Sequence, residues 1–244
     1  MNLIVDIGNS LTKLFVFEQG EIIHNSQFDE MTEKEIVSIF RSYQKISHCI
    51  ISSVKNLKED HLKLIQNKLK SVIFLDNKTI LPISNNYKSP ETLGKDRIAA
   101  IVGAYNIFPE QHVLVVDAGT AITFDFINNM GVYNGGNISP GLSMRFKALN
   151  QFTERLPLLK PKENEKFMGE NTHEAIIAGV QNGIIFEIET YIDKFLEQYP
   201  DLKVILTGGD TFFFAHKLKN RIFAKPFLVA IGLNRILLDN VKEN

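Results

Sequence analysis

The sequence has little of several residue types that would point to particular protein classes. It contains one cysteine, Cys49, and no tryptophan among 244 residues. A single cysteine excludes an internal disulfide and any cysteine-rich metal site. The six histidines are scattered along the chain without metal-ligand spacing, so we assign them no chemistry.

An excess of charge of one sign is also lacking. Lysine and arginine number 27 against 28 aspartate and glutamate, for a formal net charge of −1. Proteins that hold nucleic acid through phosphate contacts are usually basic, so we expect no nucleic-acid partner. No apolar run approaches the ~20 residues of a membrane span, and the first residues lack the features of a signal peptide. We therefore expect a cytoplasmic protein with no membrane partner.

What is present is an alternation of apolar segments. Hydrophobic residues make up 44% of the chain, which is typical of globular proteins, and its 244 residues suffice for one large or two smaller domains. Short β-rich runs alternate with helix-period segments, a pattern that predicts an α/β fold with mostly parallel sheets. The longest predicted helix spans 172–199, and 152–170 reads as a loop because of its prolines and charges.

One pattern occurs twice. Asp6, Gly8 and Thr12 recur 111 residues later as Asp117, Gly119 and Thr123, each time after a predicted strand and before more β-rich sequence. We interpret this as two similar α/β domains, residues 1–110 and 111–244.

Each copy places an acid at the end of a strand and glycine in the turn. Glycine lets the backbone approach a phosphate, and the acid can hold a cation beside it. Lys13 adds a positive charge to the first copy. Each copy alone is equally explained as a hairpin turn, but two copies in matching contexts favour paired phosphate loops.

Three further segments begin predicted helices. Gly94-Lys95-Asp96-Arg97 sets an acid that could accept a proton beside an arginine that could bind an anion, although Asp96 could also simply cap the helix. Thr207-Gly208-Gly209-Asp210 leaves room for a flat base or ribose, or is another helix cap. Thr172 has the same ambiguity. The Walker pattern is absent, so an ATP site here is of another type.

These motifs together resemble the type III pantothenate kinase family, which belongs to the actin, sugar-kinase and heat-shock ATPase superfamily. The resemblance runs from Asp6 to Gly232. It is carried by the motifs at 6–13, 94–97, 117–123 and 207–210, and by Gly-Gly-Asn-Ile-Ser-Pro-Gly at 135–141. It implies an α/β fold of two similar ribonuclease H-like (actin-like ATPase) domains with an active-site cleft between them. Ser10 stands where threonine is usual in the family.

The resemblance also implies an activity and a division of roles. The enzyme would transfer the γ-phosphate of ATP, with Mg²⁺, to pantothenate, giving 4′-phosphopantothenate for coenzyme A synthesis. ATP would contact the first loop and Thr120, Asp117 would bind K⁺ or NH₄⁺, and Asp96 would be the general base. A homodimer is implied, with Thr172 reaching the neighbouring subunit's pocket. The residues for ATP are Asp6, Ile7, Gly8, Asn9, Ser10, Leu11, Thr12, Lys13 and Thr120, and those for pantothenate are Tyr87, Gly94, Lys95, Asp96, Arg97 and Thr172.

Two other functions fit the same fold. One is a kinase for another small alcohol, and the other is a nucleotide-binding regulator that binds ATP without turnover. The 94–97 motif and the carboxylate of Asp96 favour pantothenate kinase over both.

Overall fold

A computed structural model describes the whole chain except residues 9, 56–57, 165 and 243–244. The chain divides into two compact units. The first is formed by Met1–Asn106 together with Leu228–Asn244, and the second by Ile107–Phe227. Among the described residues, no helix is long and apolar enough to cross a membrane.

The first unit contains a five-stranded mixed sheet in the order β3-β2-β1-β4-β5. The strands β1, β2 and β3 are antiparallel, and β4 and β5 continue the sheet parallel to β1. The strands are β1 (Asn2–Ile7), β2 (Thr12–Glu18), β3 (Glu21–Phe28), β4 (His48–Ser53) and β5 (Ser71–Phe74). The helices are α1 (Glu33–Ser42), α2 (Glu59–Gln66), α3 (Lys95–Ile107) and α7 (Leu228–Lys242), with the short elements β6 (Ser84–Asn85) and η1 (Pro90–Thr92) before α3.

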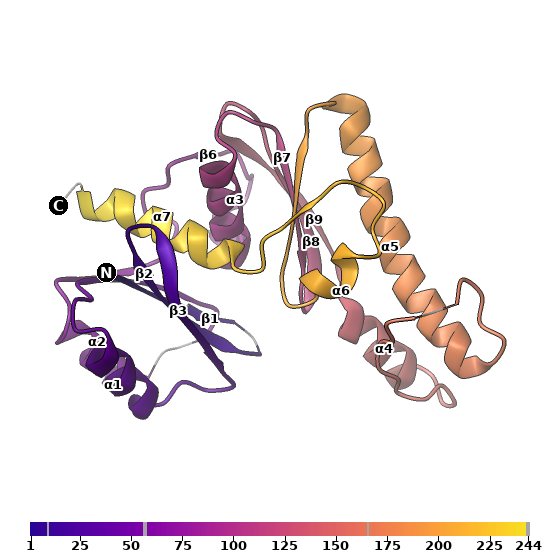
Figure 1. The fold of residues 1–244 in the computed structure, drawn as a ribbon, viewed down its shortest axis with the longest axis horizontal. Coiled ribbons are helices and arrows are strands. Elements are labelled where there is room, and N and C mark those ends of the chain that lie inside the picture. Colours follow the sequence, from indigo (N-terminus) through magenta and orange to yellow (C-terminus); the bar gives the residue numbers. More distant parts are fainter. Residues whose placement is uncertain (9, 56–57, 165, 243–244) are drawn as a thin grey trace. The chain divides into compact units, whose positions relative to one another are not determined.

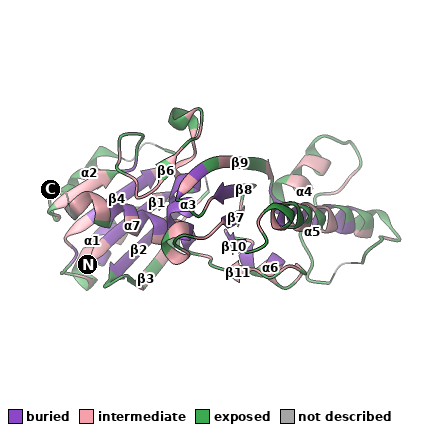
Figure 2. Cartoon of the chain, turned by 90° about the horizontal axis from the view of Figure 1, so that it is seen from above, coloured by how far each residue is buried: buried purple, intermediate pink, exposed green. Residues whose placement is uncertain are grey.

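Alternation along β1 directs its side chains to the two faces of this sheet. Leu3, Val5 and Ile7 pack in a buried cluster with Ile36 of α1 and Ile65 of α2. The helices α1 and α2 lie on one side of the sheet and α7 on the other (Figure 1). Buried residues are concentrated in β1, β2 and β4 (Figure 2).

The helix α7 belongs to the first unit, although its sequence position suggested the C-terminal domain. It packs on β1 and β4, and the Asn2 side chain donates a hydrogen bond to Asn234 Oδ1 at 2.9 Å. It also crosses α3 closely, because a Cβ at Gly232 would lie 1.7 Å from the carbonyl oxygen of Ala99. The division near residue 107 lies close to the predicted one at 110, but residues 228–244 return to the N-terminal unit.

The second unit repeats the strand pattern of the first. Its strands lie in the order β11-β10-β7-β8-β9, with β7, β8 and β9 antiparallel and β10 and β11 parallel to β7. They are β7 (Val113–Ala118), β8 (Ala121–Ile127), β9 (Val132–Pro140), β10 (Lys203–Thr207) and β11 (Phe223–Ala224). The helices are α4 (Leu142–Gln151), α5 (Thr172–Gln198) and α6 (Thr211–Ala215).

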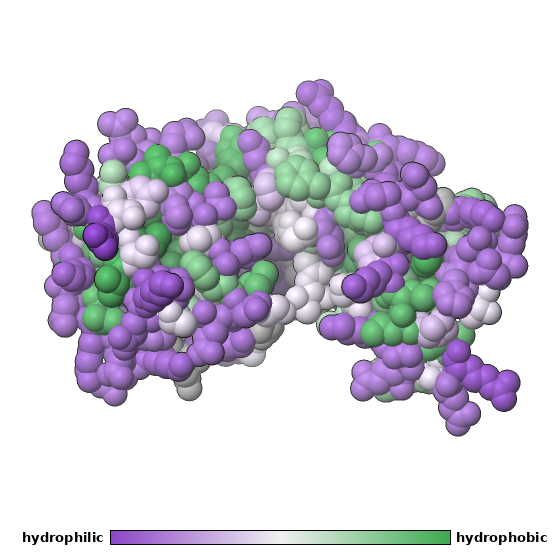
Figure 3. Space-filling view, turned by 60° about the horizontal axis from the view of Figure 1, so that its bottom comes forward, coloured by the Kyte–Doolittle hydropathy of each residue, from purple (hydrophilic) through white to green (hydrophobic). Residues whose placement is uncertain are grey.

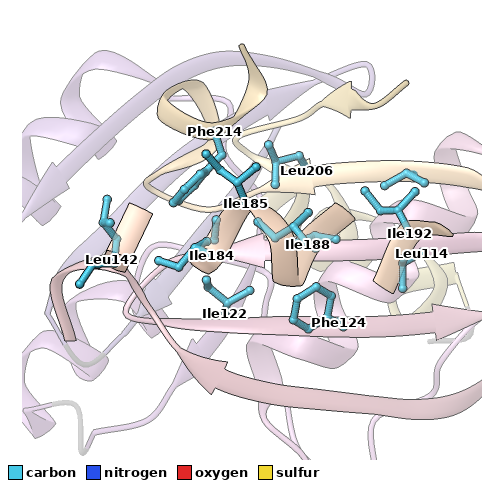
Figure 4. Close-up of a cluster of buried hydrophobic side chains, with 14 of the residues drawn as sticks. Leu114, Ile122, Phe124, Leu142, Ile184, Ile185, Ile188, Ile192, Leu206 and Phe214 are labelled. Atoms are coloured by element: carbon cyan, nitrogen blue, oxygen red, sulfur yellow. The ribbon is translucent and has the colours of Figure 1, made fainter. Parts of the chain in front are cut away.

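The long helix α5 covers one face of this second sheet. Ile184, Ile188 and Ile192 of α5 belong to the same buried cluster as Leu114, Phe124 and Leu206 of the strands (Figure 4). Isoleucines at a spacing of four residues lie on one side of a helix, which explains why α5 presents a continuous apolar stripe to the sheet.

The predicted α/β fold with two similar units is confirmed, and one detail of it is wrong. The sheets are mixed rather than mostly parallel. In each unit the first three strands are connected in sequence by short turns, which permits antiparallel pairing. Parallel pairing begins only where a longer crossover connection intervenes.

Candidate functional site

The first glycine loop closes the β1–β2 hairpin. The N–H of Gly8 donates to the carbonyl of Leu11 at 3.0 Å, directly after the strand pair Ile7 and Thr12. The side chains of Ile7 and Thr12 are buried, so these two residues shape the loop rather than present side chains to a ligand. Ser10 is exposed and Leu11 half-buried. The predicted ATP contact Asn9 lies outside the described residues.

Asp6 lies between two polar neighbours on adjacent strands. It pairs with Lys13 of β2 on one side and with Ser52 of β4 on the other. Burial raises the pKa of the Asp6 carboxyl to about 6; Lys13 and a hydrogen bond from Ser52 oppose this rise, while the negative charge of Asp96 adds to it. The fold thus brings Asp6, Lys13 and Asp96 together, from positions far apart in the chain.

Asp96 is an exposed residue in the first turn of α3. Its Oδ1 accepts a hydrogen bond from the backbone N–H of Arg97 at 2.8 Å. A Cβ at Gly94 would lie 2.5 Å from the same oxygen, so a side chain there would require the Asp96 carboxylate to move. The carboxylate therefore makes a helix-start contact and remains open to solvent, where a substrate hydroxyl can reach it.

Lys95 attaches this helix start to the end of β4. Its Nζ donates to the carbonyl oxygen of Ser53 at 3.1 Å. Ser52 and Ser53 therefore connect the two motifs, Ser52 by its bond to Asp6 and Ser53 by its bond to Lys95. The sequence reasoning missed both serines. The sequence did offer a signal, since Ser52 and Ser53 are two small polar residues at the end of the apolar strand β4. This strand runs parallel to β1, which carries Asp6 near its own end.

Tyr87 and Arg97 form a second pair in this unit. The guanidinium carbon of Arg97 lies 5.6 Å from the centre of the Tyr87 ring, within the range of a cation–π contact. Arg97 is buried and Tyr87 half-buried. The structure thus joins Tyr87 to the 94–97 motif, and their role as pantothenate contacts stays a prediction.

The second glycine loop closes the β7–β8 hairpin in the other unit. The N–H of Gly119 donates to the carbonyl of Ala121 at 3.1 Å, and the carbonyl of Thr120 accepts from the N–H of Gly141 at 3.2 Å. A Cβ at Gly141 would lie 2.4 Å from that carbonyl oxygen. Gly141, the last residue of the 135–141 motif, therefore holds the loop by close packing and leaves the Thr120 side chain exposed.

Asp117 lies between polar residues of the two neighbouring strands in the second unit. It pairs with Thr123 of β8 and Thr207 of β10. The next turn lies against it, since a Cβ at Gly208 would be 2.4 Å from Asp117 Oδ1 and from the carbonyl of Ala118. Gly208 has φ of +96°, a conformation that favours glycine. The Asp210 N–H donates to the carbonyl of Ala118 at 2.9 Å, and burial raises the pKa of the Asp210 carboxyl.

Each unit offers few carboxylates that could bind a metal ion. Among the described residues, no group of three or more His, Cys, Asp or Glu side chains is placed to hold a metal ion. Single carboxylates beside backbone oxygens suit hard cations that keep most of their other ligands from water or phosphate.

Thr172 is the first residue of α5, but it does not cap the helix. The cap is Asn171, whose Oδ1 accepts from the Glu174 N–H at 3.0 Å. Thr172 instead lines a groove of about 880 Å³ between α4, the segment after it and the first half of α5. The groove is mainly apolar and includes Leu149, Phe152, Leu156, Ile176 and Gly179.

The predicted site residues therefore fall into three groups. Asp6, Lys13, Tyr87 and the 94–97 motif lie together in the first unit, as the pairings above show. Asp117 and Thr120 lie together in the second unit, and Thr172 lies in the groove of the same unit.

Comparison with known proteins gives a consistent result. A family model described as type III pantothenate kinase matches residues 2–194. A type III pantothenate kinase of Bacteroides fragilis is 46% identical over 237 residues, covering 97% of each chain. A solved structure from Campylobacter jejuni, described as a Baf family transcriptional activator, has a TM-score of 0.66 at 26% identity and covers 98% of this chain and 99% of that one. A Listeria monocytogenes protein described as an N-acetylmannosamine kinase shares the fold, with a TM-score of 0.55 at 15% identity, covering 100% of this chain and 99% of that one.

Proposed function

The chain belongs to the type III pantothenate kinase family, and we propose that Asp96 is the proton acceptor of its reaction. As a member of that family it is an ATP-dependent pantothenate kinase, which feeds coenzyme A synthesis. The observation that carries our proposal is the exposed carboxylate of Asp96, which lies close enough to the half-buried Asp6 to raise the pKa of Asp6. A carboxylate in that position can take the proton of the attacking hydroxyl, a contribution of about 10²–10⁴-fold.

Arg97 and Tyr87 are the proposed contacts to pantothenate. Pantothenate carries a carboxylate, and a guanidinium is the side chain best shaped to bind one. The Tyr87 ring beside Arg97 supports the orientation of that guanidinium. Gly94 and Lys95 complete the pocket by fixing the start of α3, the first through close packing and the second through its bond to Ser53.

ATP is proposed to contact both glycine loops, 6–13 and 119–120. Lys13 supplies positive charge, while the exposed Ser10 and Thr120 supply hydroxyl groups. In phosphoryl transfer the protein contributes mainly positioning and neutralisation of charge. Mg²⁺ bound to the phosphates supplies part of that neutralisation when it is present. Use of ATP as donor favours a cytoplasmic reaction.

Asp117 is proposed to hold a monovalent cation, K⁺ or NH₄⁺. The cross-strand position that holds Lys13 in the first copy holds the neutral Thr123 in the second. A cation at Asp117 would give the second loop the positive charge that Lys13 gives the first. The carboxylate and the hydroxyl of Thr123 are oxygen donors of the kind that such ions accept.

A homodimer is proposed, with the α4–α5 groove as the interface that brings Thr172 to the neighbouring subunit. Phe152, which lines the groove, is 81% exposed, and the contacting pair of Phe167 and Phe186, the latter on α5, is 75% and 49% exposed. Figure 3 shows hydrophobic patches on the surface, each bordered by hydrophilic residues. Apolar patches of this kind mark interaction surfaces, and a two-fold interface buries the same patch on both subunits.

Mixing of two inactive variants tests this arrangement. Asp96→Asn removes the base and Thr172→Arg blocks the proposed contact from the partner. If the site is shared, mixed dimers carry one site with both residues intact, so mixing restores part of the pantothenate-dependent ATP turnover. If turnover of the mixture stays at the level of the separate variants, Thr172 acts in the site of its own chain.

Gly179 offers a direct test of the interface. A Cβ at Gly179 would meet no described atom within 4 Å outside the neighbouring backbone of its own helix, so we expect Gly179→Phe to fold and to obstruct a partner. We expect monomers by analytical ultracentrifugation. Glu197→Phe is the matched control on the same helix, about 27 Å further along, and should remain dimeric.

A further inference from the structure

Asp125 is a buried acid in the middle of β8 that none of the roles proposed above uses. Its exposed fraction is 0%, and removing a carboxylate from water costs free energy unless hydrogen bonds satisfy it. Two hydroxyl groups donate to it, Tyr133 Oη to Oδ1 at 2.7 Å and Thr123 Oγ1 to Oδ2 at 3.0 Å. Tyr133 is itself fully buried, so these bonds form inside the second unit.

A glycine leaves the space that this carboxylate occupies. Gly136 of β9 stands opposite Asp125 in the sheet. A Cβ at Gly136 would lie 2.5 Å from Asp125 Oδ1 and 1.9 Å from the carbonyl oxygen of Phe124. A side chain at this position would therefore displace the strand or the carboxylate. The second glycine of the 135–141 motif thus serves Asp125, whereas Gly141 serves the loop that carries Thr120.

The alternation of β8 places Thr123 and Asp125 on the same face of the second sheet. Ile122 and Phe124 belong to the cluster that packs against α5 (Figure 4), so Thr123 and Asp125 point to the opposite face. Asp117 stands opposite Thr123 on β7, and opposite residues of an antiparallel pair have Cβ atoms about 5 Å apart. The Thr123 side chain thus has one carboxylate two residues along its own strand and another across the strand pair.

The proton of the Thr123 hydroxyl decides what this arrangement can bind. A hydroxyl has one proton, and that of Thr123 is donated to Asp125. Toward Asp117 the hydroxyl can then only accept, and a carboxylate is an acceptor as well. Two acceptors that face each other are held together by a cation or a hydrogen-bond donor placed between them.

We propose that Asp125 is a positioning residue for the cation site at Asp117. By accepting the Thr123 proton, Asp125 makes the hydroxyl a second oxygen ligand, so that both side chains offer acceptors to K⁺. Asp125 is not a ligand and acts through Thr123. The inference rests on the proposed cation site, and it adds the residue that enables a neutral hydroxyl to serve there.

Binding of K⁺ to the full chain without nucleotide tests this role independently of turnover. A ligand that binds only the folded state raises the midpoint of thermal unfolding, so KCl is compared with choline chloride at equal ionic strength. We expect a saturable rise in wild type. In Asp125→Asn the amide Nδ2 donates to Thr123 Oγ1, the hydroxyl proton turns toward Asp117, and Kd for K⁺ rises about tenfold. A Kd within about twofold of wild type overturns the proposal.

A double-mutant cycle separates positioning from general support of the fold. Thr123→Val removes the ligand oxygen and should raise Kd for K⁺ about tenfold, whereas Thr123→Ser keeps the hydroxyl and should leave Kd within about twofold. Adding Asp125→Asn to Thr123→Val should weaken binding no further, because Asp125 acts only through that hydroxyl. Independent effects on log Kd contradict the proposal. Wild-type affinity in Thr123→Val does so as well, and that variant leaves Asp125 unchanged.

Tyr133→Phe is the matched control, because it removes the other donor to the same carboxylate. It should lower the midpoint of unfolding and leave Kd for K⁺ within about twofold, since Thr123 still donates to Asp125. A loss of affinity equal to that of Asp125→Asn contradicts a role for the Thr123 proton. If wild type responds equally to KCl and choline chloride, the cation site at Asp117 fails. If wild type responds to K⁺ and Asp125→Asn responds equally well, only the role of Asp125 fails.

Discussion

The two glycine loops begin from the same sequence pattern and end in different surroundings. In the first, Asp6 faces Lys13 and Ser52, and the loop spans four residues, 8–11. In the second, Asp117 faces Thr123 and Thr207, and the loop spans three residues, 119–121. The residue that corresponds to Lys13 by the sequence offset is Phe124, which is buried in the core.

A shift of one residue in register explains this difference. Successive residues of a strand point to opposite faces of a sheet. Because the second loop is one residue shorter, Thr123 rather than Phe124 stands opposite Asp117. The first copy thus carries its own positive charge, and we expect the second to obtain one from a bound ion.

The largest effect should come from removing the carboxylate of Asp96, which lies near Asp6. Asp96→Asn keeps the size of the side chain but cannot accept a proton, so kcat should fall by about 10²-fold or more, with ATP affinity unchanged. Asp60→Asn is the control, because Asp60 is likewise an exposed second residue of a helix, α2. If steady-state assays show kcat of both variants within threefold of wild type, Asp96 is not the general base and serves only at the start of α3.

A stability effect should distinguish the glycines of the second site. Gly208→Ala places a Cβ against the Ala118 carbonyl and Asp117 at a positive φ, which should lower the free energy of unfolding by about 2–3 kcal/mol. Gly209→Ala meets open space and should leave unfolding in urea within about 0.5 kcal/mol of wild type. Equal losses in the two variants would show that the turn does not pack on Asp117 in solution.

The cation of the second loop can be tested by its salt dependence. At constant ionic strength, replacing Na⁺ with K⁺ or NH₄⁺ should raise activity about tenfold, because a bound cation neutralises charge near the phosphates. Asp117→Asn should have low activity and lose this dependence. Activity that is equal in Na⁺ and K⁺ would contradict a cation site at Asp117.

The smallest effect concerns the stability cost of burying Asp6. Its pKa is raised from 3.8 to about 6 in the folded state, so the folded protein binds the proton more tightly than the unfolded chain. The protonated carboxyl is therefore favoured by folding, and this contribution to the free energy of unfolding is lost as the pH rises from about 4, the unfolded pKa, to above 6, the folded pKa. Asp6→Asn should therefore raise the free energy of unfolding by about 1–2 kcal/mol at pH 8, with a smaller gain at pH 5.

Asp76 supplies a control of opposite sign. Hydrogen bonds from the backbone N–H of Lys78 and from Thr79 lower the pKa of the Asp76 carboxyl. Its charged form is thus favoured by folding, and this stability is present above pH 4 and lost as pH falls further. Asp76→Asn should destabilise the protein at pH 8. If unfolding of Asp6→Asn shows no pH dependence relative to wild type, Asp6 is not held in a desolvated site.

The sequence by itself determined the local elements and the residue types of the site. Apolar periodicity predicted α5 as 172–199 against the observed Thr172–Gln198. The paired Asp-x-Gly motifs, each between a predicted strand and more β-rich sequence, predicted two similar units. These features depend on neighbours along the chain, which a sequence displays directly.

Only the tertiary structure decided which distant groups meet. It returned α7 to the first unit, set Ser52 beside Asp6, and placed the Gly208 turn against Asp117. Strand order and register control each of these contacts, and both depend on packing between segments far apart in sequence. The raised pKa of Asp6 has the same origin, since burial by surrounding elements causes it, and no pattern within residues 6–13 records that burial.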